Sequence, residues 1–370
     1  MTPTHAPDAP PTRAGELLAA YHDMRSDYGP IHARATADLG RRLPTDHPLP
    51  AYQVSTPGPL RALISLDAPE IAFLEDPRDC PPEGRSDPWS FLCEQLDHWA
   101  GLGSTRQLRV ARVLARLGFW QLLTEIVDPL DGDPSNLEVC RLAQVRDSAF
   151  LRIGVDPTGA ATRIRESTTR LTDDETLPAS TRIGAAINLL VGHARAASEI
   201  AAVDHWGRRA TALFEATDPA RLSAILRSAY WRGLSFVPFL HGDHGSTRDM
   251  LDAAEENAVT AVAASADPGQ VEGIPAAENM HLLLETRGRA AWESGDIDAA
   301  ERYYRALVAH DELDAKVHVR LADLLARTDR VAEARECYLR SAHLGAPHTL
   351  YARTQVARLA SGGHDGTVRL

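Results

Sequence analysis

Apolar residues recur every three or four positions along most of the chain from about residue 104 to residue 361, which is the spacing of amphipathic α-helices. In the segment 219–239, for example, they fall on one helical face. They are Leu222, Ile225, Leu226, Ala229, Tyr230, Gly233 and Phe236. Short turns containing Gly, Asp or Pro separate such segments, and no β-rich window competes with them. The pattern therefore predicts an all-α fold of antiparallel helix pairs.

Four helix pairs are predicted before residue 281. They are 105–117 with 119–128, 136–153 with 157–171, 179–199 with 201–216, and 219–239 with 246–264. Residues 14–103 are predicted as an irregular helical N-terminal region, in which the pattern over 44–88 leaves the fold open. Residues 1–13, rich in Pro, Thr and Ala, are predicted to be a disordered tail, and residues 362–370 a second tail.

Two consecutive units, 281–314 and 315–348, repeat with a period of 34 residues and no insertion. The repeated positions carry small or aromatic residues. The matched pairs are Gly288 with Ala322, Ala300 with Ala334, and Tyr304 with Tyr338. A helix over 349–360 is predicted to cap the array, because a stack of helix pairs must cover its exposed end. The predicted array of helical hairpins therefore covers 104–361.

The segment 293–307 resembles the turn and second helix of a tetratricopeptide repeat (TPR), and 328–342 repeats the pattern. The resemblance implies a right-handed α-α superhelix, a TPR-like solenoid in which Gly288 and Ala300 lie where two helices cross. Two positions depart from the family pattern. Arg287 stands where the family prefers an aliphatic side chain, and Asp329 replaces the turn glycine.

The resemblance also implies a function in binding: a TPR-like adaptor or regulatory protein that holds a peptide or protein partner in a concave groove. The first helix of each unit would face that groove. The predicted binding residues are Arg289, Trp292, Lys316, Arg327, Arg353, Tyr230 and Trp231. Glu285 and Asp323 fall on the same helix faces. Arginine and aromatic side chains are frequent anchors at interfaces.

An alternative hypothesis is a helical-repeat enzyme, or an enzyme partner, in peptide or natural-product modification. It would use the aromatic and histidine cluster of 230–244, where His241 and His244 flank Asp243. Two histidines and one carboxylate do not complete a metal site, and Asp243 or Ser246 as a helix cap explains the loop. We therefore predict no catalytic residue, no bound metal and no cofactor, and an enzymatic role stays the less favoured hypothesis.

The amino-acid composition excludes or disfavours several further classes of function. Lys316 is the chain's only lysine, and its context suits neither a P-loop, a kinase nor a Schiff-base enzyme. The preference for arginine is typical of high-GC bacteria. A formal net charge of −12 disfavours nucleic acid and acidic membranes as partners. A third hypothesis, nucleic-acid binding through the arginine stripe, would use Arg106, Arg109, Arg112 and Arg116.

The remaining sequence features predict a soluble protein of the cytoplasm with reduced cysteines. No apolar run approaches the roughly 18 residues of a membrane span, and the first residues do not resemble a secretory signal. The four cysteines lie far apart, which argues against a zinc cluster or a disulfide framework. The partner's identity and the oligomeric state stay open at this level.

Overall fold

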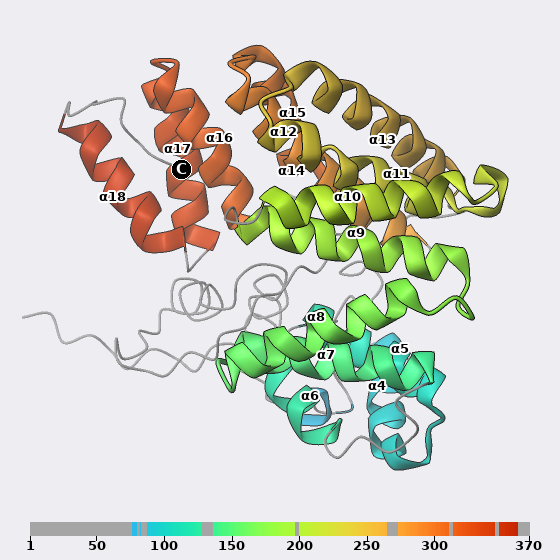
Figure 1. Cartoon of the computed structure of the whole chain (residues 1–370). Coiled ribbons are helices and arrows are strands. Elements are labelled where there is room, and N and C mark those ends of the chain that lie inside the picture. The colour runs from blue at the N-terminus through green and yellow to red at the C-terminus, as the bar shows by residue number, and fades with distance from the viewer. Residues whose placement is uncertain are drawn as a thin grey trace, which may run out of the picture. The chain divides into compact units, whose positions relative to one another are not determined.

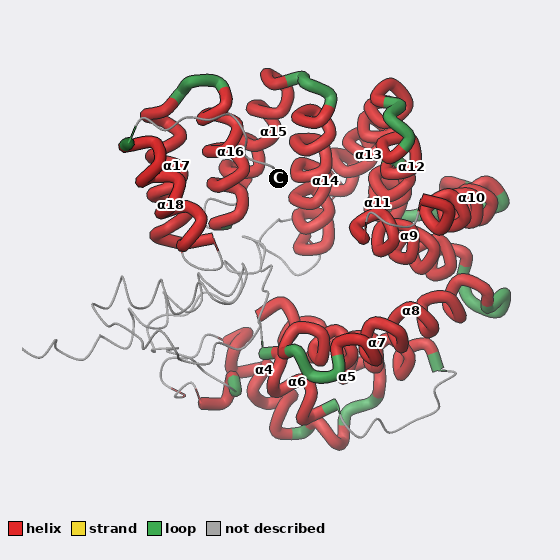
Figure 2. Tube along the Cα trace, turned by 60° about the vertical axis from the view of Figure 1, so that its left-hand side comes forward, coloured by secondary structure: helices red, strands yellow, loops and turns green. Residues whose placement is uncertain are grey.

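The structure is a computed structural model, and the residues that it describes are entirely helix, turn and loop (Figures 1 and 2). They are 76–79, 82, 87–117, 119–127, 136–196, 200–264, 273–310, 314–344 and 348–361. This confirms the all-α prediction for the described chain. The expectations for residues 1–75 and 362–370 lie outside the described residues.

The chain forms two compact units. Ala161–His310 is one, and the other combines the described parts of Met1–Ala160 and Asp311–Leu370. The helix α8 (Pro157–Asp173) crosses the boundary between them. No helix among the described residues is long and apolar enough to cross a lipid bilayer.

Several short helices precede α7 (Leu137–Ile153) in the described part of the chain. They are η1 (Pro77–Asp79), α4 (Asp87–Asp97), η3 (Trp99–Gly101), α5 (Ser104–Leu117) and α6 (Trp120–Ile126). Both α5 and α6 lie against α7, and Leu114, Phe119 and Leu123 are fully buried. The arginines 106, 109 and 112 of the stripe on α5 are exposed, as expected of a solvated helix face.

The unit Ala161–His310 is a stack of helices in which each new helix packs on an earlier one (Figure 1). Its elements are α9 (Ala179–Ala196), α10 (Ile200–Glu215), η4 (Pro219–Arg221), α11 (Ala224–Leu234), α12 (Phe236–Leu240), α13 (His244–Ala264), α14 (Gly273–Glu293) and α15 (Ile297–His310). The helix α9 packs on α10 and α11, α11 on α13, and α14 on α13 and α15. The predicted pairs 179–199 with 201–216 and 219–239 with 246–264 are therefore present.

The predicted helix over 219–239 is divided in the structure into η4, α11 and α12. Pro238 explains the second division, because proline has no amide hydrogen to donate to the carbonyl of Leu234, four residues earlier. The helix α11 ends at Leu234, and α12 begins at Phe236 with Pro238 inside it. The apolar period continues through the break and therefore gave no sign of it.

The helix crossing predicted at Gly288 is confirmed by the packing of α14 on α15. A Cβ atom added at Gly288 would lie 2.5 Å from Cε1 of Tyr304, which itself is only 2% exposed. The turn between the two helices contains Gly295 at φ 80°. The corresponding residue of the next hairpin, Asp329, has φ 58°, so an aspartate occupies the same left-handed conformation there.

The last three helices form a second group of stacked elements: α16 (Ala315–Arg327), α17 (Val331–Leu344) and α18 (His348–Ala360). The helix α17 packs on both α16 and α18, as expected of a hairpin with a capping helix. The carboxylate of Asp323 is buried between them and accepts hydrogen bonds from the hydroxyls of Tyr338 (2.5 Å) and Tyr351 (2.8 Å). The prediction that Asp323 faces a groove is therefore wrong: its side chain links α16, α17 and α18.

Candidate protein-interaction surface

Three of the residues predicted to face a groove lie on one side of α14, at spacings of four and three residues. They are Glu285, Arg289 and Trp292. Arg289 is exposed, whereas Glu285 and Trp292 are half-buried. The guanidinium carbon of Arg289 lies 5.9 Å from the ring centroid of Phe239 on α12, in a cation–π contact. This contact restrains an exposed side chain and so reduces the entropy lost when a partner binds.

Arg232 of α11 carries a guanidinium that the described residues do not satisfy. Its Nε atom has no accessible surface and no hydrogen-bond partner. No ion pair joins this guanidinium to a described residue, and the residue as a whole is half-buried. Arg227, one and a half turns earlier on α11, is different: it donates to Asn257 Oδ1 (2.7 Å) and to two backbone carbonyls.

Burial lowers the pKa of Arg232 to about 10, from an ordinary value of 12.5. The positive charge of Arg195 on α9 lowers this pKa further, and the negative charge of Glu285 on α14 raises it. Arg232 therefore stays protonated at neutral pH and carries a charge whose burial is disfavoured. The electrostatic coupling also shows that α9, α11 and α14 bring their charged side chains to one region.

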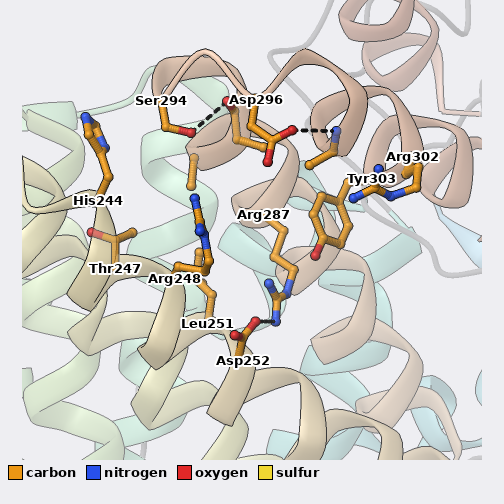
Figure 3. A pocket seen from close by; sticks show the side chains of 13 residues that line it. His244, Thr247, Arg248, Leu251, Asp252, Arg287, Ser294, Asp296, Arg302 and Tyr303 are labelled. Carbon is orange, nitrogen blue, oxygen red and sulfur yellow. Dashed lines mark hydrogen bonds and ion pairs between the residues drawn. The ribbon is translucent and has the colours of Figure 1, made fainter.

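A pocket of about 220 Å³ lies among α13, α14 and the start of α15 (Figure 3). Its walls carry Thr247, Arg248, Asp296 and Arg302, with His244 at the first residue of α13. Asp296 caps α15 by accepting a hydrogen bond from the amide of Ala299 (3.1 Å). The pocket is therefore polar, and part of its acidic lining is already engaged in local structure.

Arg287 in this pocket shows how the repeat accommodates arginine at a position where its family prefers an aliphatic residue. The side chain is buried, and its guanidinium pairs with Asp252 (2.6 Å) and Glu255 (2.5 Å) of α13. It also lies 5.3 Å from the ring centroid of Tyr303, whose pKa is raised by burial and lowered by the charge of Arg287. Two carboxylates of the preceding helix thus compensate this buried cation.

The aromatic residues predicted as binding residues on α11 belong to the interior. Tyr230 is only 2% exposed and stacks on Phe214, with ring centroids 3.9 Å apart and planes 4° apart. Trp231 is half-buried and packs against the two hydrophobic clusters of this unit. Tyr230 therefore offers no surface to a partner, and its role is packing.

The other predicted binding residues, Lys316, Arg327 and Arg353, lie in the other unit. Lys316 is half-buried in the first turn of α16, where its backbone amide donates to Asp314 (2.9 Å). Arg327 ends α16 and Arg353 lies on α18; both are exposed. The structure therefore divides the predicted binding residues between its two units.

The histidine loop has a local structural explanation. His241 Nε2 lies 2.9 Å from Asp204 of α10, and Asp243 accepts hydrogen bonds from the amide (3.0 Å) and hydroxyl (2.6 Å) of Ser246. These bonds lower the pKa of Asp243. Among the described residues no group of three or more His, Cys, Asp or Glu side chains is placed to hold a metal ion. Asp243 thus acts as a cap at the start of α13.

Sequence reasoning did not single out Arg195 or Arg232, and it noted Arg287 only as a departure from the family pattern. A signal for Arg232 exists: it is the only charged residue of the largely apolar segment 228–240. Three helices, α9, α13 and α14, pack on α11, and this tertiary packing is not contained in the periodicity of one helix.

Comparison with known families matches residues 286–348 to the tetratricopeptide repeat. The match begins within α14 and ends at the start of α18. Together with the helical hairpins of the described chain, it shows a TPR-like helical repeat protein. Repeats of this kind usually mediate protein interactions. No curated protein matches the chain.

Proposed function

We propose that the protein is an adaptor or regulatory protein that binds a peptide segment of a protein partner. The observation that carries this proposal is the exposed Arg289, restrained by Phe239, next to the half-buried Trp292 on α14. Arginine and tryptophan are the residue types on which interface free energy is most often concentrated. Both lie in the segment that matches an interaction repeat.

The charges near α14 favour an acidic partner segment. Arg195, Arg232 and Arg289 contribute three positive charges, against the negative charges of Glu285 and of the exposed Glu293, one helical turn after Arg289. These residues therefore leave an excess of one positive charge, although the whole chain carries a formal net charge of −12. Complementary charge speeds encounter and disfavours basic partners. In the other unit, Lys316, Arg327 and Arg353 stay candidate binding residues, and all three are at least partly exposed.

The proposal is tested by selecting ligands for the full-length protein from a random peptide library and measuring their affinities. The double variant Arg289→Ala plus Trp292→Ala should weaken the selected peptides by tenfold or more, because two interface anchors are removed. Two matched controls should bind as the wild type does: Arg109→Ala plus Arg112→Ala on α5, and His241→Ala plus His244→Ala. Selection of no peptide, or equal binding by the double variant, would reject the proposal.

A further inference from the structure

We propose that Arg232 is an anchor for one carboxylate of the partner, which its terminal nitrogens bind while Arg195 supports the bound charge. The inference rests on the proposed function and specifies the chemistry of the ligand. It names a position on α11 outside the repeat segment of 286–348.

Arg232 differs from two other arginines of the same unit, the half-buried Arg227 and the buried Arg287. Arg227 is satisfied by Asn257 and two carbonyls, and Arg287 by two carboxylates. The Nε atoms of Arg232 and Arg287 are both solvent-inaccessible without a well-aligned hydrogen bond, but only Arg287 is compensated by ion pairs with described carboxylates. Buried cations in proteins are paired because an unpaired one is costly. A group from outside the described chain would supply the missing partner.

The charges around Arg232 favour a singly charged anion as the missing group. Arg232 and Arg195 provide two positive charges, and Glu285 provides one negative charge close enough to act on Arg232. The local excess is therefore one positive charge, which a carboxylate neutralises and a phosphate dianion exceeds. A carboxylate is also planar and accepts two parallel hydrogen bonds from one guanidinium.

Arg232 lies on a helix that packs against the helix carrying Arg289 and Trp292. Glu285 lies one helical turn before Arg289 on α14, and α11 packs directly on α14. A segment that contacts Arg289 and Trp292 therefore passes near the region where Arg232 reaches the surface. The face of α14 with Arg289 and Trp292 would contact the length of the segment, and Arg232 would bind one of its acidic groups.

The experiment uses two peptide libraries against the full-length protein: random peptides with a blocked C-terminus, and random peptides with a free C-terminus. Enrichment of Asp or Glu at one position of the blocked library identifies an acidic side chain as the ligand. Enrichment confined to the free library, without an acidic side chain, identifies a terminal carboxylate. Either outcome supports a carboxylate anchor. Selected peptides that lack both features would overturn it and leave the proposed function intact.

The assignment to Arg232 is tested by the affinity of the selected peptides for Arg232→Met. Loss of a charge-assisted hydrogen bond should weaken binding about tenfold to a hundredfold. Arg232→Met should bind the acidic peptide and the same peptide with an amide in place of the carboxylate with equal affinity. A general loss of affinity would weaken both peptides but keep the preference for the acidic one. Arg232→Lys should retain part of the affinity. A preference for the acid over the amide that persists in Arg232→Met would overturn the assignment.

Arg195→Met provides an independent variant at an exposed position, where folding should be unaffected. Its affinity for the acidic peptide should fall several-fold, with a smaller effect on the amide analogue, because Arg195 acts through its charge. Equal effects on both peptides would remove Arg195 from the anchor.

Discussion

The buried guanidinium of Arg232 leads to an unusual expectation: replacing it should stabilise the protein. The difference between its ordinary pKa of 12.5 and about 10 corresponds to about 3 kcal/mol of disfavoured charge at neutral pH. Methionine has a similar length, carries no charge and fills irregular space well. We expect Arg232→Met to raise the free energy of unfolding by about 1–3 kcal/mol, because part of the cost is relieved by water at the terminal nitrogens.

The assay is thermal unfolding of the full-length protein at neutral pH and low salt, without ligand. For a unit of this size each kcal/mol corresponds to about 2–4 °C in Tm. The transition of the unit Ala161–His310 should therefore move upward by several degrees. Arg289→Met is the matched control, since Arg289 is exposed and its replacement should change the Tm by less than about 1–2 °C.

A lower Tm for Arg232→Met would refute this reasoning, because it would mean that the guanidinium is compensated within the unliganded chain. An increase of similar size in Arg289→Met would also refute it, by showing that lower positive charge in general, and not relief of one buried cation, stabilises the unit.

Three further predictions concern the hairpins. Asp329→Gly should raise the free energy of unfolding by up to about 1 kcal/mol, measured by urea denaturation, because glycine adopts φ 58° without steric cost; a destabilised variant would contradict this. Gly288→Ala should lower it by about 1–3 kcal/mol, since its Cβ would lie 2.5 Å from the buried Tyr304 ring. The double variant Gly288→Ala plus Tyr304→Leu should recover part of the lost free energy of unfolding. Burial raises the pKa of Asp323 above 3.8, so the folded state binds its proton more tightly and loses stability as pH rises from 3.8 through the higher folded pKa. Asp323→Asn should lack this component of the pH dependence in denaturation curves.

The helices and the repeat could be predicted from the sequence because each depends on local spacing. The 34-residue period predicted a helix crossing at Gly288 and a helix over 349–360, and the structure has both. The packing of the Tyr304 ring against Gly288 was not predicted. The division of 219–239 was missed because an apolar period persists across Pro238, although the missing amide hydrogen of that proline is visible in the sequence.

The candidate site was predictable only for residues whose exposure follows from one helix. Arg289 and Trp292 are three residues apart, so the sequence alone places them on one face of α14. Tyr230 and Asp323 occupy positions that looked equally exposed from the helical pattern. Phe214 stacks on Tyr230, and two tyrosines from other helices hydrogen-bond to Asp323. The surroundings of Arg232 depend on the helices that pack on α11, which are α9, α13 and α14. The lack of a partner for its Nε therefore could not be predicted from one segment.

The ion pairs of Arg287 with Asp252 and Glu255 bear on how such an array can evolve. Most contacts between repeated hairpins are apolar and tolerate a new neighbour, which allows repeats to be duplicated or lost. Here α14 presents a buried cation that only an acidic preceding helix can accommodate. Insertion of another hairpin between α13 and α14 would separate Arg287 from Asp252 and Glu255 and leave an unpaired guanidinium inside the protein. These ion pairs therefore fix the order of the two helices.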